Sequence, residues 1–127
     1  MANVLVVEDE ADSREVVSRF LGRIGHRPVC AQDGRAALVK LIEEPPDVIV
    51  LDMRMPLLDG IGLLEIVRSY LRWHKLPVII LSAQATPEEL RRARDMGVNY
   101  IFHKAQFQLA DLQAAIDDVT GITPSLV

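Results

Sequence analysis

Short apolar runs alternate along this chain with segments in which apolar residues recur at helical spacing. Three runs rich in valine, isoleucine and leucine occupy Asn3–Val7, 47–51 and 77–81. Consecutive apolar positions, rather than alternating ones, are typical of strands that are buried on both faces of a sheet. Two weaker runs, at 28–31 and Tyr100–His103, complete a predicted set of five strands.

A helical pattern follows each predicted strand. Apolar residues recur three and four positions apart in five segments, at residues 11–24, 34–42, 59–71, 87–97 and 108–119. Asp59 is expected to cap the third helix, and Pro87 to occupy the first turn of the fourth. Strict alternation of strand and helix predicts an α/β fold in which helices cover both faces of a parallel sheet.

The composition narrows the class of protein. The 127 residues fit one domain and leave no room for a second. A net charge of −4 argues against a general nucleic-acid binder, and no apolar run approaches the roughly 18 residues of a membrane span. The single cysteine, Cys30, leaves no partner for an internal disulfide. We therefore expect a cytoplasmic protein that binds neither membrane nor nucleic acid directly, with one domain at 1–120 and a tail or linker stub at 121–127.

Side chains capable of chemistry follow the predicted strands at their carboxyl ends. They are Glu8 and Asp9 after the first strand, Asp52 after the third, Ser82 after the fourth and Lys104 after the fifth. Each residue alone is more often a cap, a turn residue or a solvated side chain. Because ligands of open α/β sheets bind beyond the carboxyl ends of the strands, all five together indicate a site at that edge.

The residue types indicate phosphoryl chemistry with a metal ion. Three carboxylates at close quarters repel one another unless a cation neutralises them, and oxygen ligands without histidine or cysteine suit Mg²⁺. Lys104 is a point charge suited to a phosphate, and the Ser82 hydroxyl can donate to a phosphoryl oxygen. Asp52 is the natural nucleophile, and its product would be an aspartyl-phosphate.

The segment 48–60, V-I-V-L-D-M-R-M-P-L-L-D-G, resembles the phospho-acceptor segment of bacterial response-regulator receiver domains. Other parts of the chain agree with the family in order and spacing: the pair Glu8-Asp9, residues 31–38, residues 77–83 and the interval from Gly97 to Lys104. The resemblance extends from residue 3 to about residue 119. It implies a flavodoxin-like, doubly wound five-stranded parallel sheet with strand order 2-1-3-4-5 and five helices.

The resemblance also implies the role of each site residue. Asp52 would accept a phosphoryl group from a sensor histidine kinase or a phosphotransfer protein, with Ser82 and Lys104 binding the phosphoryl oxygens. Mg²⁺ would be held by three carboxylates and one backbone carbonyl, those of Glu8, Asp9, Asp52 and Arg54. The protein would support only its own phosphorylation and dephosphorylation and would not be an enzyme in the ordinary sense. Its readout surface would comprise the last two helices and the strand between them, contacting a downstream output protein or an output domain missing from this chain.

Three positions depart from the family or distinguish this chain within it. The family has an aromatic switch residue three positions before the lysine, and this chain has Ile101 there. Strand alternation points the neighbouring Tyr100 and Phe102 to the opposite face. We therefore expect Ile101 to pack in the core rather than to work as a switch with Ser82. The proline after the lysine is Ala105, which predicts a trans bond there because a non-proline cis bond costs about 3 kcal/mol. The side chain of Arg54 is a candidate determinant of the phosphorylated lifetime.

Charged faces on two predicted helices raise the question of self-association. Arginines on the fourth helix and aspartates on the fifth could pair across a two-fold axis: Arg91, Arg92 and Arg94 with Asp111, Asp117 and Asp118. Exposed charge pairs contribute little. We therefore expect a monomer or at most a weak, phosphorylation-dependent dimer.

Competing classes fit the sequence less well. A phosphatase with an aspartate nucleophile would carry a second acid two residues after Asp52, where this chain has Arg54. A flavin-binding relative would need a phosphate loop where the acidic segment 8–10 stands. A receiver-like interaction module that no longer switches stays open, because Ile101 and Ala105 depart from the family.

Overall fold

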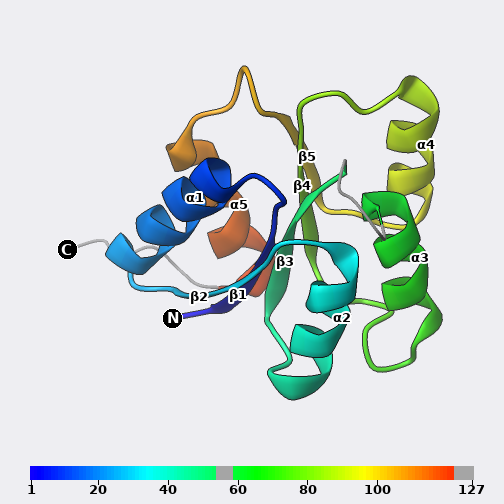
Figure 1. The fold of residues 1–127 in the computed structure, drawn as a ribbon, viewed down its shortest axis with the longest axis horizontal. Helices are drawn as coiled ribbons and strands as arrows, with labels where there is room; N and C mark the ends of the chain where they lie inside the picture. The colour runs from blue at the N-terminus through cyan, green and yellow to red at the C-terminus, as the bar shows by residue number, and fades with distance from the viewer. Residues whose placement is uncertain (54–58, 122–127) are drawn as a thin grey trace.

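The computed structural model describes residues 1–53 and 59–121, in which five strands alternate with five helices (Figure 1). The strands are β1 (Asn3–Val7), β2 (Arg27–Ala31), β3 (Val48–Asp52), β4 (Val78–Ser82) and β5 (Tyr100–His103). The helices are α1 (Ala11–Arg23), α2 (Gly34–Glu43), α3 (Gly60–Ser69), α4 (Pro87–Asp95) and α5 (Leu109–Thr120). The predicted alternation of strand and helix is confirmed.

All neighbouring strands pair in parallel, in the order β2-β1-β3-β4-β5. The chain runs from β1 to one edge of the sheet and then crosses back to build the other half from β3 onward. The order therefore reverses beside β1, and β1 and β3 flank the point where ligands of doubly wound sheets bind. The predicted fold class and strand order are both confirmed.

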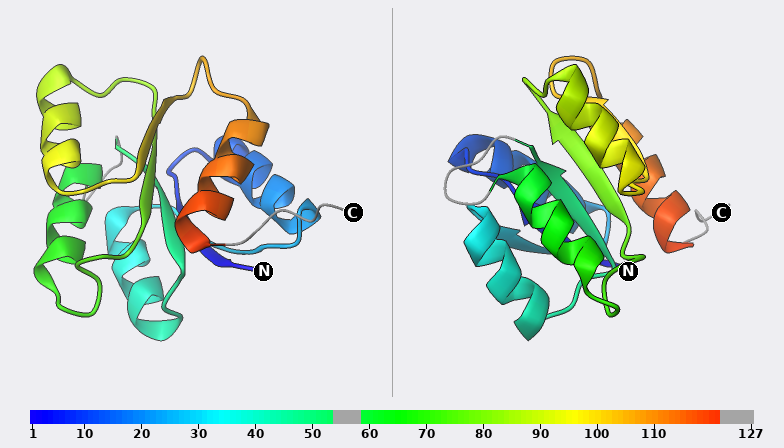
Figure 2. Two further views of the ribbon diagram at one scale, coloured as in Figure 1. Left: turned by 180° about the vertical axis from the view of Figure 1, so that it is seen from behind. Right: turned by 90° about the vertical axis from the view of Figure 1, so that its right-hand side faces the viewer.

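Helices cover the sheet on both faces, with α1 and α5 on one side and α2, α3 and α4 on the other (Figures 1 and 2). Alternate residues of β3 enter the two cores: Ile49 and Leu51 pack toward α2–α4, whereas Val48 and Val50 pack toward α1 and α5. Every residue of β3 and β4 is buried, as the consecutive apolar runs predict.

Polar caps begin three of the helices. The Asp59 carboxylate accepts a hydrogen bond from the Gly62 N–H at 2.8 Å, as predicted, and Asp33 caps α2 in the same way. Thr86 and Glu89 form a reciprocal capping box at the start of α4. The third helix is shorter than the predicted 59–71, because Tyr70 takes an extended conformation.

Two further sequence predictions can be compared with the backbone. No peptide bond within residues 1–53 and 59–121 is cis, so the expected trans bond between Lys104 and Ala105 is confirmed. None of the helices in these ranges combines the length and the apolar character that crossing a lipid bilayer requires.

Candidate functional site

The residues predicted to act together follow the carboxyl ends of four strands, at the upper edge of the molecule in Figure 1. Asp52 and Ser82 are the last residues of β3 and β4, and both are buried. The backbone N–H of Glu8 donates to Ala31 at 3.0 Å, and that of Lys104 donates to Ser82 at 2.9 Å. These bonds extend the sheet ladder past the strand ends, which fixes where the side chains emerge.

Three carboxylates converge at this edge. One oxygen each of Glu8, Asp9 and Asp52 lies within 4.8 Å of the others. Glu8 and Asp52 are each 5% exposed, whereas Asp9 is exposed to solvent. An all-oxygen donor set of this size, with one ligand open to water, fits a hard cation that keeps part of its hydration shell, such as Mg²⁺.

Lys104 lies against this cluster. Its Nζ is 3.5 Å from Asp52 Oδ2 and donates a hydrogen bond to Glu8 Oε1. Burial lowers the pKa of Lys104, but the hydrogen bond with Glu8 and the charge of Asp52 outweigh it, so that the pKa is raised overall. Lys104 therefore stays cationic, and one ammonium faces three carboxyl groups.

The pKa of Glu8 is raised in this crowded acidic cluster. This pKa is raised to about 7, because burial and the hydrogen bond and charge of Asp52 raise it more than Lys104 lowers it. In the absence of a metal ion, a proton therefore supplies part of the positive charge that the cluster requires. A divalent cation bound there would compete with that proton.

Ser82 joins the site to the loop that leads into α4. Its side chain is 1% exposed, and its Oγ accepts a hydrogen bond from the Ala85 N–H at 2.9 Å. The hydroxyl proton is not committed by this bond and can be donated to an oxygen at the site. Any rotation of Ser82 toward a new partner would break the bond to Ala85, directly before the Thr86 cap of α4.

Ile101 packs into the core on the α2–α4 side, together with Met96 and Val98. Tyr100 and Phe102 belong to the opposite core, and their rings stack with centroids 5.8 Å apart. The predicted separation of Ile101 from its aromatic neighbours is confirmed. An aliphatic side chain therefore occupies the position where the family has its aromatic switch residue.

Arg14 contributes to the site although the sequence analysis did not identify it. Its Nη1 donates to the backbone carbonyls of Glu8, at 2.9 Å, and Asp9, at 3.4 Å. The guanidinium thus ties together the loop that carries two of the carboxylates. The sequence offers one signal for this role. Arg14 lies in the first turns of α1, where the positive end of the helix dipole makes a cation unfavourable.

Gly60 closes the far side of the site. Its N–H donates to the Met53 carbonyl at 3.1 Å, and a Cβ at this position would lie 2.8 Å from the Asp52 carbonyl oxygen. Only glycine permits this approach. The predicted ligand carbonyl of Arg54, and the hypothesis about its side chain, lie outside the described residues.

The fold and site together define a class of protein: a doubly wound α/β domain with an acidic cluster, a hydroxyl and a lysine at its ligand-binding edge. Residues 4–117 match the family described as "Response regulator receiver domain". The chain belongs to this family and is a receiver domain of two-component signalling systems.

Individual relatives agree in sequence and in structure. The probable chemotaxis protein CheY of Rhizobium etli is 34% identical over 119 residues, which are 93% of this chain and 92% of that protein. The structure of chemotaxis protein CheY4 of Vibrio cholerae has a TM-score of 0.85 at 30% identity and covers 94% of this chain and 98% of its own. The Francisella response regulator 1452 receiver domain has a TM-score of 0.86 at 31% identity and covers 98% and 100%.

Other relatives are much longer than this chain. The gliding motility regulatory protein of Myxococcus xanthus is 37% identical over 117 residues, which are 92% of this chain but 15% of that protein. The chain is therefore similar to small proteins over nearly their whole length and to one part of larger regulators.

Proposed function

We propose that Asp52 is the phospho-acceptor of this receiver domain and that a phosphohistidine, on a sensor kinase or a phosphotransfer protein, is its donor. The observation that carries the proposal is the convergence of Asp52, Glu8, Asp9 and Lys104 at the carboxyl edge of the sheet. The family interacts with such partners, and no other described residues combine a buried carboxylate, a lysine and a candidate cation site.

In the proposed reaction, an Asp52 carboxylate oxygen forms a bond to phosphorus while the bond from phosphorus to the donor nitrogen breaks. The leaving imidazole keeps the electron pair of that bond. Lys104, 3.5 Å from Asp52 Oδ2, pairs with the transferred group, and the Ser82 hydroxyl donates to one of its oxygens. Glu8, Asp9 and Asp52 would hold Mg²⁺, which supplies further positive charge for the phosphoryl oxygens. The protein's chemistry is then limited to its own phosphorylation and dephosphorylation.

The proposed output follows from Ser82. When Ser82 rotates toward the phosphoryl group to donate to it, its Oγ leaves the Ala85 N–H, and this releases the loop before α4. The surface formed by α4, β5 and α5 then changes and is read by a partner protein or an attached output domain. Because Ile101 is aliphatic, the change is transmitted through the loop backbone and packing, without an aromatic hydroxyl.

We also propose that residues 1–120 make up the domain, that 121–127 is a tail or linker, and that the phosphorylated form is a monomer or a weak dimer. Within one chain Arg91 pairs with Glu88 and Arg92 with Glu65, which leaves fewer charges for a second copy. Sedimentation of the protein with and without a phosphoryl analogue tests the oligomeric state.

Intact-mass spectrometry tests the function directly. The wild-type chain, incubated with Mg²⁺ and acetyl phosphate, is expected to gain the mass of one phosphoryl group, and Asp52→Ala is expected to gain none. Equal masses for the two proteins would contradict the proposal. If wild type is phosphorylated but amide resonances of α4, β5 and α5 do not shift, the alternative of a receiver-like module without a switch is supported.

A further inference from the structure

A pocket of about 300 Å³ opens between α2 and α3, away from the acidic cluster. Leu38 and Ile42 line it from α2, Ile66 lines it from α3, and Tyr70 and Trp73 line it from the segment that follows α3. The two helices lie side by side, and the segment after α3 is at the lower right of Figure 1. The pocket therefore lies toward the end of the molecule opposite to the carboxyl edge of the sheet.

The apolar surface extends beyond the pocket. Six large apolar side chains are exposed among the described residues, and four of them lie on α2 or directly after α3: Val39, Ile42, Tyr70 and Leu71. Val39 and Ile42 are three positions apart on α2 and therefore share one side of that helix. Exposed apolar side chains that gather in one place, rather than singly, mark an interaction surface.

Trp73 is the buried residue of the pocket lining and carries an unsatisfied hydrogen-bond donor. It is 6% exposed, and its Nε1–H meets no acceptor among the residues that the structure describes. A buried N–H without an acceptor costs free energy, and native structures leave few of them. The half-exposed Tyr70 ring lies against Trp73, with centroids 5.2 Å apart, and can turn to let an oxygen atom of a bound partner reach the N–H.

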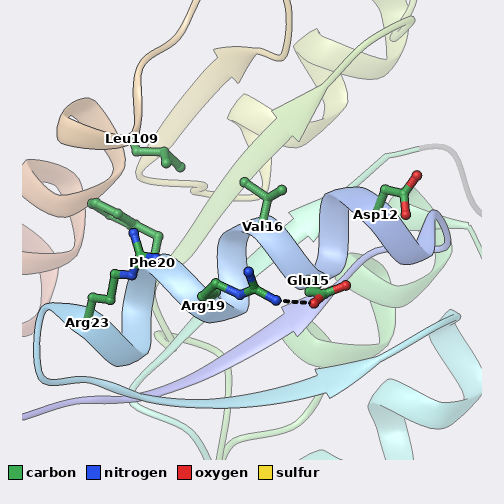
Figure 3. Close-up of a pocket in the computed structure, with 7 residues that line it drawn as sticks. All are labelled: Asp12, Glu15, Val16, Arg19, Phe20, Arg23 and Leu109. Carbon is green, nitrogen blue, oxygen red and sulfur yellow. Dashed lines mark hydrogen bonds and ion pairs between the residues drawn. The ribbon is translucent and has the colours of Figure 1, made fainter.

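The charged side chain in the pocket lining is positive, although the whole chain carries a net charge of −4. It is Arg72, and Arg35 lies one turn before Val39 on α2. Neither arginine forms an ion pair with another described residue. In the groove along α1, by contrast, Arg19 pairs with Glu15 (Figure 3). An occupant with carboxylates would therefore complement the α2–α3 face.

We propose that the pocket between α2 and α3 binds an amphipathic helix of a partner protein, with an apolar side chain in the pocket and carboxylates facing Arg72 and Arg35. Tryptophan, tyrosine and arginine are enriched at the energetic centres of protein interfaces, and all three line this pocket. A groove between two helices suits a third helix that lays its apolar face into it. No described residue of the lining belongs to the acidic cluster or to α4, β5 or α5, so the interaction does not depend on the proposed role of Asp52.

Three synthetic helices, added to the whole chain, test the proposal. Each lacks tryptophan, is cross-linked on its polar face and has about five turns, because shorter isolated helices are marginal in water. The first carries leucine along one face and glutamate on the other, the second has lysine in place of glutamate, and the third has the composition of the first with its leucines scattered around the helix. We expect the first helix to bind about tenfold more tightly than the third and about threefold more tightly than the second. Trp73 is the single tryptophan of the chain, so its fluorescence reports binding in the pocket, and its indole N–H resonance should move downfield.

Matched substitutions at exposed positions locate the binding surface. Ile42, 65% exposed, lines the pocket, whereas Val16, 55% exposed, lies on α1 at the opposite face of the sheet (Figure 3). Ile42→Asn should weaken binding of the first helix about tenfold, and Val16→Asn should bind it as wild type does. Arg72→Glu should reverse the charge preference, so that the lysine helix binds more tightly than the glutamate helix. Asp52→Ala should bind the first helix with unchanged affinity.

Equal binding of the first and third helices, or an indole N–H resonance that does not move, would overturn the proposal. A loss of affinity in Val16→Asn as large as that in Ile42→Asn would overturn it as well. If the chain dimerises in sedimentation and Ile42→Asn abolishes the dimer, a second copy covers the pocket and the partner helix is wrong. Binding to vesicles of anionic phospholipid without binding of the first helix would replace the partner helix by a membrane surface. Because no step involves phosphoryl transfer, these outcomes stay separate from the test of Asp52 as acceptor.

Discussion

Replacing Gly60 by alanine tests how tightly α3 packs against the proposed phosphorylation site. The added Cβ would lie 2.6 Å from Met53 Cα and 2.8 Å from the Asp52 carbonyl oxygen. Both are backbone atoms, and the Met53 side chain is fully buried, so no flexible group can move aside. The start of α3 or the end of β3 must shift instead.

Two opposing effects determine how far Gly60→Ala lowers the free energy of unfolding. Inserting a methyl group into a packed interior typically costs about 1–3 kcal/mol, whereas the better helix propensity of alanine returns at most ~1 kcal/mol. We expect Gly60→Ala to lower the free energy of unfolding by about 1–2 kcal/mol. For a chain of this length, that corresponds to a fall in Tm of roughly 3–10 °C. Because the Asp52 carbonyl is displaced, the affinity for Mg²⁺ should fall as well.

Urea unfolding, followed by circular dichroism and by the fluorescence of the single tryptophan, Trp73, measures this cost. Gly22→Ala is the matched control, because Gly22 lies in α1 and its added Cβ would contact nothing within 4 Å. That control should be stabilised by about 0.5–1 kcal/mol. If both variants gain stability equally, the close approach of Gly60 to β3 does not constrain the fold and the reasoning is wrong.

Further predictions concern the charges of the site. Because the pKa of Glu8 is raised from 4.5 to about 7 on folding, its contribution to stability in the absence of metal is complete below pH 4.5 and is lost as the pH rises through 7. Wild type should therefore lose stability relative to Glu8→Gln between pH 5 and pH 8 in urea titrations with a chelator, and a constant difference would argue against a shared proton. Asp52→Asn removes one of three crowded carboxylates, so it should raise the Tm measured without metal at pH 8. It should also abolish the rise in Tm that we expect Mg²⁺ to give the wild-type protein. An unchanged Tm without metal would count against repulsion within the cluster. Arg14→Gln frees the carbonyls of Glu8 and Asp9 and should weaken Mg²⁺ binding several-fold in calorimetry, whereas Arg19→Gln, which loses an exposed pair with Glu15 on the same helix, should bind as wild type does.

The fold was predictable because its main signals are local. Consecutive apolar residues in β3 and β4 indicate burial on both faces, and strand–helix alternation leaves few parallel topologies. Convergence of Asp52, Ser82 and Lys104 also follows from topology, since the carboxyl ends of parallel strands share one edge. The order of strands was implied by the family resemblance and confirmed by the pairing.

Features that depend on distances in space were not predictable. The contact of Arg14 with two backbone carbonyls requires the exact path of the loop between β1 and α1. The raised pKa of Glu8 depends on burial and on its hydrogen bond with Asp52, neither of which the pattern of residues reveals. The proximity of Gly60 to β3 likewise arises only after α3 packs.

The pairing of Lys104 with Glu8 joins residues 96 positions apart, so the charges of the site can be brought together only late in the synthesis of the chain. Glu8 and Asp9, directly after β1, leave the ribosome early, while their cationic partner is made after all five strands. A nascent chain that ends before residue 104 carries Asp52, the proposed acceptor, but lacks the lysine that pairs with it. Because contacts of such long sequence separation also form slowly, the Lys104–Glu8 pair, and with it the proposed ability to accept a phosphoryl group, is acquired late.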